Sequence, residues 1–363
     1  MMLSFTTCTK DQFTCNSGLC INILDRCNSR PDCYDLSDEF NCRKINPGPS
    51  YQPYIAPPPV NKSDKIVIVT SADIMSILDI DEIASIFQVQ FFLHLTWLDS
   101  RLKFYNLKND TGLNALSPME MQQLWIPVLM FENTEDKPLT RVDEKTSITI
   151  QKQGSFSLSK LEDVENQQSF EGSENSISMT GFYNIRFICN YEMKWYPFDI
   201  QKCTLRLAML GKSSDFAQLE TQVLHFVGRE EVNQYVVKSY SMRVSEKEEL
   251  EIEIVLGRKL LTIILTTIVP TILLNIISYA TNHFKAFFFE AIVTVNVTAM
   301  LVQTTLFIEV GEISNQLNVI QVSKSLPPTS YIKMMEYYLI FCLLIPCVEV
   351  LLHTLMDSLR MSV

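Results

Sequence analysis

Hydrophobic and polar residues alternate through much of the middle of the chain. In residues 89–97 every second residue is large and apolar and the others are polar, except Phe92, which breaks the pattern. A similar alternation recurs in 204–209, and a period of two predicts strands with one buried face. The segment 71–86 mixes both kinds of residue and supports no assignment. Because strand signals dominate the whole segment 64–257, we predict a β-sandwich there.

Three long apolar stretches lie in the last third of the chain. The first, 260–280, runs for 21 residues without a charge, and the others cover 286–308 and about 334–356. A run of about 20 apolar residues can cross a bilayer as a helix, so we predict a transmembrane domain over 258–356. Pro270 should kink the first span because it cannot donate a backbone hydrogen bond. Buried helices of a soluble protein are the alternative, but three such stretches close together argue against it.

The middle stretch carries a stripe of hydroxyl side chains. Residues at steps of four and three along a helix share one face. Here they are Glu290, Thr294, Thr298, Leu301, Thr305, Ile308 and Glu312. Several copies around an axis would line a water-filled pore, in which threonines replace water around an ion and a leucine ring closes by dewetting. The alternative is a packed bundle whose threonines bond the carbonyls four residues earlier.

The chain is apolar but acidic, and its cysteines are unevenly distributed. It has 363 residues and a net charge of −11. Without a basic patch, nucleic-acid binding is not expected. Six of the ten cysteines fall between Cys8 and Cys42. Such a dense cluster predicts a disulfide scaffold formed in an oxidising compartment, and the absence of histidine and of a CxxC pair disfavours zinc.

Acidic residues crowd the second half of this cysteine cluster. Four of the eight residues 32–39 are acids. Crowded carboxylates repel unless a cation neutralises them, and oxygen ligands suit calcium, although a solvated acidic turn is the alternative. The cysteine spacing and the acids together resemble a low-density lipoprotein receptor class A module covering residues 8–42.

That resemblance implies three disulfides and a calcium site. The implied pairs are Cys8–Cys20, Cys15–Cys33 and Cys27–Cys42. The implied ligands are nearby backbone carbonyls and the side chains of Asn28, Asp32, Asp38 and Glu39. Because Asn28 replaces the aspartate usual in the family, we expect weakened calcium binding.

A proline-rich segment, 43–63, follows this module. Proline favours the extended polyproline II conformation, so we predict a semi-extended linker. Asn61 and Asn109 each begin a glycosylation sequon.

Cys189 and Cys203 enclose thirteen residues upstream of the apolar stretches. The spacing, and the tip Tyr196-Pro197-Phe198-Asp199, resemble the signature loop of the pentameric Cys-loop ligand-gated ion channels. The resemblance implies a Cys189–Cys203 disulfide, an extracellular β-sandwich that binds a small agonist between subunits, and a pore lined by the second span. It also implies that gating is coupled through Tyr196, Pro197, Phe198, Asp199, Arg258, Pro327 and Tyr331.

Other segments extend this resemblance over about 64–356. The motif beginning at Trp97 is similar to a strand beside the family's agonist pocket, and the one beginning at Trp125 is similar to its first principal-face loop. The loop expected before the first span, roughly 228–242, offers two tyrosines but no vicinal cysteine pair. The candidate pocket residues are therefore Trp97, Trp125, Tyr235 and Tyr240. Because cation–π binding needs several ring faces, this incomplete aromatic box argues against acetylcholine.

The prediction is a multidomain membrane protein with a small disulfide and calcium module, an extracellular β-sandwich and an α-helical transmembrane bundle. Three spans are present where the family has four, and the start of the chain lacks a leader pattern, which predicts a fragment or a truncated subunit. Residues 313–325 form a candidate insert. We expect a multi-pass plasma-membrane protein with an extracellular N-terminus, which assembles with itself or with related subunits as a pentamer in the lipid bilayer.

The expected activity is agonist-gated ion conduction. Glu290 at the inner mouth favours cations, whereas the segments 289–296 and 326–333 look more like invertebrate pH- or zinc-gated chloride channels, so we predict chloride. The alternatives are a cation-selective member, a non-conducting regulatory subunit, and an LDL-receptor-like adhesion or uptake receptor. The sequence shows no nucleophile–base pair, phosphate loop or catalytic metal cluster, so we do not expect an enzyme.

Overall fold

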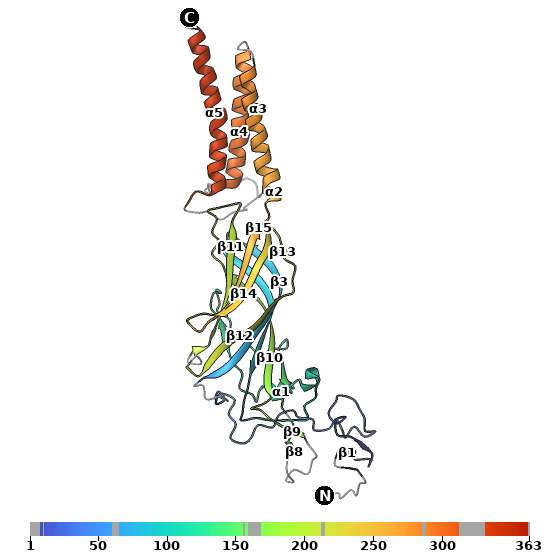
Figure 1. Ribbon diagram of the computed structural model, residues 1–363. Coiled ribbons are helices and arrows are strands. Elements are labelled where there is room, and N and C mark those ends of the chain that lie inside the picture. The colour runs from blue at the N-terminus through green and yellow to red at the C-terminus, as the bar shows by residue number, and fades with distance from the viewer. Residues whose placement is uncertain are drawn as a thin grey trace.

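The structure is a computed structural model that describes residues 8–9, 11–59, 65–154, 157–158, 168–211, 215–284, 288–311 and 331–361. Three predicted site residues, Asn61, Glu312 and Pro327, lie outside these ranges, as does the candidate insert 313–325. A small N-terminal unit, a β-rich body and a group of helices follow one another along the long axis, with the two termini at opposite ends (Figure 1). This arrangement confirms the predicted fold class.

The N-terminal unit contains little regular structure. Two short strands, β1 (Gln12–Thr14) and β2 (Cys20–Asn22), pair antiparallel. Disulfides join Cys8 to Cys20, Cys15 to Cys33 and Cys27 to Cys42, the same pairs that the class A resemblance implies. So short a segment cannot enclose a large apolar core, and the cystines take that place.

Two five-stranded sheets form the body. The first has the order β12-β3-β4-β10-β7 and the second the order β13-β14-β15-β11-β6. The bounds in the first sheet are β3 Ile66–Asp81, β4 Ile86–Trp97, β7 Ser147–Gln151, β10 Ser176–Ile188 and β12 Ala217–Phe226. Those in the second are β6 Leu129–Phe131, β11 Ile200–Met209, β13 Glu231–Val232, β14 Tyr235–Val244 and β15 Leu250–Arg258.

Smaller elements fill the end of the body that faces the N-terminal unit. A three-stranded sheet has the order β5-β9-β8. The bounds are β5 Lys103–Tyr105, β8 Ser157–Leu158 and β9 Gln168–Glu171, with a 3-10 turn η1 at Thr111–Asn114 and a short helix α1 at Pro118–Met121.

Strand β4 alternates between half-buried and buried residues over its whole length. Phe92, which breaks the hydrophobic pattern, lies on the half-buried face together with His94. Strand β3 continues to Asp81, so most of the unassigned segment 71–86 is strand. Its pairing with β4 shifts register between Ile74 and Ser76 and again between Ile77 and Asp79. Such irregularities interrupt the period-two alternation of buried and exposed residues.

The core lies between the two sheets and is rich in aromatic rings. Phe87, Phe91, Phe131 and Phe187 are fully buried, and their contacting ring centres lie 5.7 to 6.2 Å apart. The Cys189–Cys203 disulfide joins the end of β10 in one sheet to β11 in the other. It therefore ties the two layers together at the end of the sandwich nearest the helices.

Three helical segments, Leu261–His283, Phe289–Phe307 and Met334–Arg360, are long and apolar enough to cross a membrane. The first is divided into α2 (Leu261–Ile263), a π-helical segment η3 (Ile264–Ile268), α3 (Val269–Ala280) and a 3-10 turn η4 (Thr281–His283). The others are α4 (Phe289–Gly311) and α5 (Met334–Met361). Pro270 lies in the first turn of α3, where its missing N–H costs little, and a π-helical segment directly precedes that helix.

Candidate functional site: the joint between sandwich and helices

The Cys189–Cys203 loop lies at the end of the sandwich and contacts the segment that opens α5. Backbone hydrogen bonds join Met334 N to Lys194 O at 2.9 Å and Met335 N to Tyr196 O at 3.2 Å. The Tyr331 hydroxyl accepts a hydrogen bond from Met193 N at 2.9 Å. The loop is thus bonded to Tyr331, Met334 and Met335.

Apolar side chains reinforce this contact. Met193 and Tyr196 from the loop form a buried cluster with Met335 and Leu339 from α5. Residues of the first and second spans pack around the cluster, including Ile263, Ile268 and Phe307. Movement of the loop relative to α5 would therefore expose apolar surface on all three spans.

Arg258, the last residue of β15, lies at the centre of a buried ion cluster. Its Nε donates to Asp199 Oδ1 at 2.8 Å and its Nη2 donates to Asp199 Oδ2 at 3.0 Å. Its Nη1 lies 2.9 Å from Glu82 Oε1. The Arg258 side chain is fully buried, and both carboxylates are nearly so. The pair with Asp199 is bidentate, the geometry in which a guanidinium binds a carboxylate most strongly.

Two tyrosines complete the cluster. The guanidinium of Arg258 lies over the ring of Tyr196, at 4.9 Å from its centre, and over the ring of Tyr235, at 4.6 Å. The Tyr235 hydroxyl donates to Glu82 Oε1 at 2.6 Å and accepts from Arg258. Because Tyr196 also packs on α5, a single ring connects the ion cluster with the helices.

Burial and charge act in opposite directions on these groups. Burial alone would lower the pKa of Arg258, but hydrogen bonds to Asp199 and Glu82 outweigh it and raise that pKa above its ordinary value. Burial also raises the pKa of Tyr235, against the influence of Arg258. The arginine therefore stays charged, and removing either of its carboxylate partners would leave that buried charge less well compensated.

Several predicted coupling residues meet at this joint. Tyr196, Asp199, Arg258 and Tyr331 all take part in it, whereas Phe198 is 53% exposed. The Tyr196–Pro197 peptide bond is cis. The sequence interpretation missed Glu82, which lies in the turn between β3 and β4, because the register shifts of β3 hide where that turn begins.

The predicted agonist-pocket residues do not gather in one place. Trp97 and Trp125 lie buried in the core, where their rings meet edge to face with centres 6.2 Å apart. Tyr240 is partly exposed and stacks on Phe226. Tyr235 is buried and belongs to the joint, where it contacts Arg258 and Glu82.

The chain before the first span also differs from the prediction. Residues 228–242 do not form one loop, because β13 and most of β14 lie within them. The hairpin that connects β14 to β15 spans only 245–249, closed by a hydrogen bond from Ser245 N to Glu249 O. This hairpin contains no aromatic residue.

A different group of rings and polar side chains lies on the outward face of the first sheet. Phe92 and Phe182 are cross-strand partners with ring centres 5.1 Å apart, and His94 stacks beside Phe92. His94 bonds Thr180 Oγ1 through Nδ1 at 2.9 Å and Asp73 Oδ2 through Nε2 at 3.1 Å. We call Asp73, Phe92, His94, Thr180 and Phe182 the outward patch. Its sequence signal is Phe92, because a large ring on the polar side of a strand has no core to fill.

The predicted pore stripe lies on an exposed face of α4. Exposed residues include Glu290, Thr294, Thr298, Leu301 and Thr305, and the side chain of Ile308 is outside the described set. Thr294 and Thr298 also donate to the carbonyls of residues 290 and 294, at 2.7 and 2.6 Å. Such bonds, which the packed-bundle alternative expected, therefore form on residues that remain exposed.

The opposite face of α4 carries two buried amides. Gln303 donates to Asn275 Oδ1 of α3 at 2.7 Å. Asn296 bonds Ser278 of α3 and donates to Thr281 Oγ1, and Ser278 in turn donates to Glu349 of α5 at 2.9 Å. Polar contacts thus join all three helices, which explains a carboxylate at Glu349 within an apolar span.

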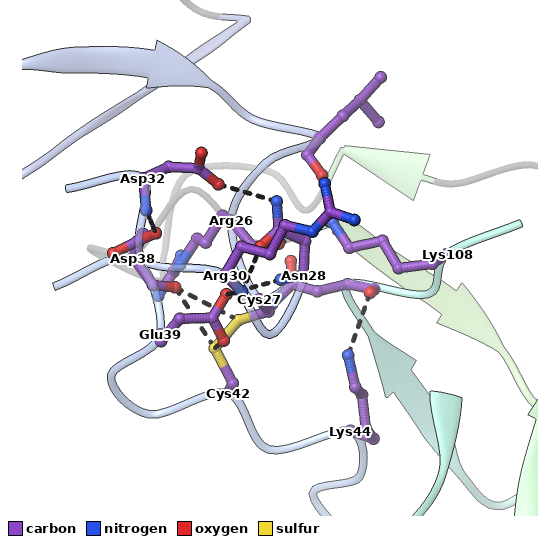
Figure 2. The surroundings of a disulfide bond; sticks show 12 residues. Arg26, Cys27, Asn28, Arg30, Asp32, Asp38, Glu39, Cys42, Lys44 and Lys108 are labelled. Atoms are coloured by element: carbon purple, nitrogen blue, oxygen red, sulfur yellow. Dashed lines mark hydrogen bonds between the residues drawn. A yellow bond between two sulfur atoms is a disulfide. The ribbon is translucent and has the colours of Figure 1, made fainter. Parts of the chain in front are cut away.

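The four predicted calcium ligands form one connected group (Figure 2). Asn28 Nδ2 donates to Asp32 Oδ2 at 2.8 Å, Asp32 N donates to Asp38 Oδ2 at 2.7 Å, and Asn28 N donates to Glu39 Oε1 at 2.7 Å. Asp38 is fully buried, and its Oδ1 has no hydrogen-bond partner. A buried carboxylate oxygen without a partner is costly, and a hard cation that prefers oxygen would satisfy it. These residues therefore fit calcium.

Among the residues that the structure describes, one other close group could suggest a metal: Cys15, Cys33 and Asp35. The two cysteines are bonded to each other, so they offer no thiolate to a metal. This group carries no metal site.

Comparison with known proteins places these features in context. The family model described as "neurotransmitter-gated ion-channel ligand binding domain" matches residues 48–260, and that of the "low-density lipoprotein receptor domain class A" matches residues 6–42. The chain is 22% identical over 281 residues to a gamma-aminobutyric acid receptor subunit beta-like of Drosophila melanogaster, covering 72% of this chain and 50% of the relative. It is 23% identical over 308 residues to the glutamate-gated chloride channel of the same organism, covering 81% and 59%.

A separate relative matches the N-terminal unit. The vitellogenin receptor of Solenopsis invicta is 60% identical over 37 residues, which are 10% of this chain and 2% of the receptor. For the channel relatives, the chain spans only about half of their length.

Proposed function

The chain belongs to the neurotransmitter-gated ion-channel family, and from that premise we propose that it is a subunit of a pentameric chloride channel opened by a small extracellular agonist. A relative that is itself a glutamate-gated chloride channel supports the choice of chloride. The lipid bilayer would hold the three apolar helices, and the sandwich would face the outside of the cell with glycans at Asn61 and Asn109. The domain limits we propose are 8–42 for the class A module, 64–257 for the sandwich and 258–356 for the helices.

The joint carries this proposal most directly. Arg258 ends the strand that leads into the first span, and Asp199 belongs to the loop that packs on α5. A change in the sandwich that moved either group would strain a fully buried ion pair, and the pair cannot separate without leaving a charge uncompensated. The agonist would then favour the open state because it binds more tightly to the sandwich conformation of the open channel than to that of the closed channel.

Replacement of Arg258 by glutamine tests the joint. In the full-length protein we expect R258Q to remove agonist-evoked current while subunits still reach the cell surface. Lys259→Gln is the matched control, because Lys259 is the next residue, carries the same charge and pairs on the surface with Glu231 at 2.7 Å. Current from R258Q that equals that of K259Q would contradict the role of the joint. If R258Q fails to reach the surface, Arg258→Lys keeps the charge without the bidentate geometry and serves in its place.

The outward patch is the face on which we propose that the agonist binds, between this subunit and its neighbour. Its half-exposed rings offer stacking surfaces, and His94 with Asp73 offers polar contacts. Tyr240 remains a second candidate because its ring is 43% exposed. Phe92→Ala should raise the agonist concentration for half-maximal current, whereas Phe87→Leu, a core change, should alter expression instead.

The exposed stripe of α4 would line the pore, from Glu290 at the inner end through Leu301 to Ile308 and Glu312. Five copies of Leu301 would form an apolar constriction, and threonine hydroxyls would contact the ion on either side. We propose in addition that the class A module binds calcium through Asn28, Asp32, Asp38 and Glu39 with nearby carbonyls. Calcium would neutralise the crowded carboxylates and hold the module folded.

A further inference from the structure

Lys108, from the segment after β5, reaches out of the sandwich and into the class A module. Its Nζ donates to the backbone carbonyls of Leu24 at 2.5 Å and of Arg26 at 2.6 Å. Figure 2 shows Lys108 and Arg26 beside the Cys27–Cys42 disulfide and the acidic ligand group. A side chain of the sandwich thus binds the chain segment that leads directly to Asn28, the first proposed calcium ligand.

The sandwich fixes the base of this side chain. Lys108 N donates to Asn114 Oδ1 at 2.7 Å, and Asn114 Nδ2 donates to the carbonyls of Lys108 at 2.9 Å and of Ile150 at 3.0 Å. Asn114 is fully buried, and Ile150 belongs to the core strand β7. The backbone from which the Lys108 side chain extends is therefore bonded to the core of the sandwich.

Other contacts cross the same boundary. Asn106 Nδ2 lies 3.8 Å from Cys27 Sγ, and Glu120 Oε1 accepts hydrogen bonds from Lys44 N at 2.7 Å and from Ile45 N at 3.3 Å. Lys44 lies two residues after Cys42, the last residue of the module, and Ile45 is buried against the sandwich core. The proline-rich segment is thus anchored at its first residues, and it does not act as a free tether there.

Lys108 is half-buried, so this contact partly removes its charge from water. Burial is the main reason that its pKa falls to about 8. Lys103, five residues earlier, provides a contrast: its side chain is 59% exposed and lies 3.5 Å from Glu171. A surface lysine beside a freely tethered module would stay in water, as Lys103 does, because removing an ammonium group from water is unfavourable.

We propose that the sandwich contains a docking site for its own class A module, centred on Lys108, and that docking and calcium binding are thermodynamically coupled. The segment held by Lys108 ends two residues before Asn28, so the docked position restricts the loop that supplies the calcium ligands. Coupling of this kind is reciprocal: docking strengthens calcium binding, and calcium strengthens docking by the same factor. The coupling rests on the calcium binding proposed above, and it does not depend on channel activity.

Calcium titration of the purified full-length protein tests the coupling. We compare the wild-type protein with Lys108→Met and with the control Lys103→Met, which removes a nearby lysine of strand β5 that pairs with Glu171 of the sandwich. We expect K108M to weaken calcium binding by about 5-fold or more, within the usual range of coupling between sites, and K103M to leave it unchanged. Hydrogen exchange supplies the reciprocal measurement: calcium removal should speed exchange in residues 103–116 of the wild-type protein, but not in K108M.

Each outcome decides the question. Equal calcium affinities for K108M and K103M, or wild-type exchange in 103–116 that ignores calcium, would overturn the coupling. A wild-type protein that binds no calcium would overturn the calcium site and the coupling together, and leave the channel proposal intact. If K108M lowers the thermal midpoint of the sandwich, Asn106→Ala removes a contact with Cys27 without touching Lys108 and is judged by the same two measurements.

Discussion

One buried guanidinium illustrates the energetics of the joint at the scale of residues. Arg258 faces two carboxylates, and Glu82 Oε2 has no hydrogen-bond partner. Breaking a buried ion pair by removing one partner typically costs about 3–5 kcal/mol, because the other charge is left uncompensated. The joint is therefore strong in one arrangement and sensitive to any displacement.

Glu290 is the residue whose charge bears on ion selectivity. It is exposed at the start of α4, at the inner end of the proposed pore. A ring of five carboxylates there would attract cations and repel chloride. Glu290→Ala should therefore move the reversal potential towards the chloride equilibrium potential, as measured with dilution potentials. Asp357→Ala, near the C-terminal end of α5, controls for charge at the same side of the membrane, and equal potentials in E290A and wild type would exclude a role for Glu290.

Single residues could be predicted where a motif fixes their position. Asp199 and Arg258 were assigned through the resemblance of the loop and the first span. Glu82 and Lys108 could not be assigned, because their roles depend on partners far apart in the sequence. The contact of Tyr235 could not be predicted for the same reason: the sequence shows a ring near the first span, but not that this ring lies against Arg258.

Helix α4 combines two different faces at the scale of elements. Its exposed face carries the threonine stripe, while its buried face includes Asn296 and Gln303, which bond the neighbouring helices. Buried amides hold a helix in one rotational position, because rotation would leave them unpaired in an apolar environment. The polar contacts of the buried face thus determine which face remains for the pore.

Cysteine substitution tests this rotational position. Thr298→Cys should react with a water-soluble thiol reagent and lose current, because the stripe would face water. Asn296→Cys is not suitable as a control because it removes a buried amide, so Ala299→Cys, on the buried face beside Thr298, is used instead. Reaction at residue 299 with normal current in treated T298C would show that α4 presents a different face to the pore.

Elements were predictable where the pattern was long and regular. The alternation in β4 and the three apolar stretches gave both the type and the approximate limits of the elements. Strand β3 escaped assignment because its register shifts interrupt the alternation. The π-helical segment before Pro270 also escaped, because proline signals an irregularity without specifying its form.

The whole molecule consists of three units that follow one another along its length (Figure 1). Lys108 connects the module to the sandwich, and the Cys189–Cys203 loop with Arg258 connects the sandwich to the helices. The order of these units could be read from cysteine spacing, strand pattern and apolar stretches. The docking of the module could not, since the proline-rich segment indicates only a linker.

Calcium removal should act on this assembly from its N-terminal end. With calcium at 100 times its dissociation constant, a bound ion stabilises the folded module by about 2.7 kcal/mol, or roughly a hundredfold in its opening equilibrium. A chelator should therefore speed proteolysis within residues 8–42, while cleavage in β3 and β4 stays slow. A module that remains as resistant in chelator as in calcium would refute its dependence on the ion.

The proposed function requires that the chain is part of a chloride channel that an extracellular agonist opens. Current recorded from cells expressing the full-length protein, under a panel of amines, protons and zinc with replacement of external chloride, tests this most directly. We predict that one of these stimuli opens a current whose reversal potential follows the chloride gradient. A current whose reversal potential ignores chloride, or the absence of any current although subunits are at the cell surface, would contradict it.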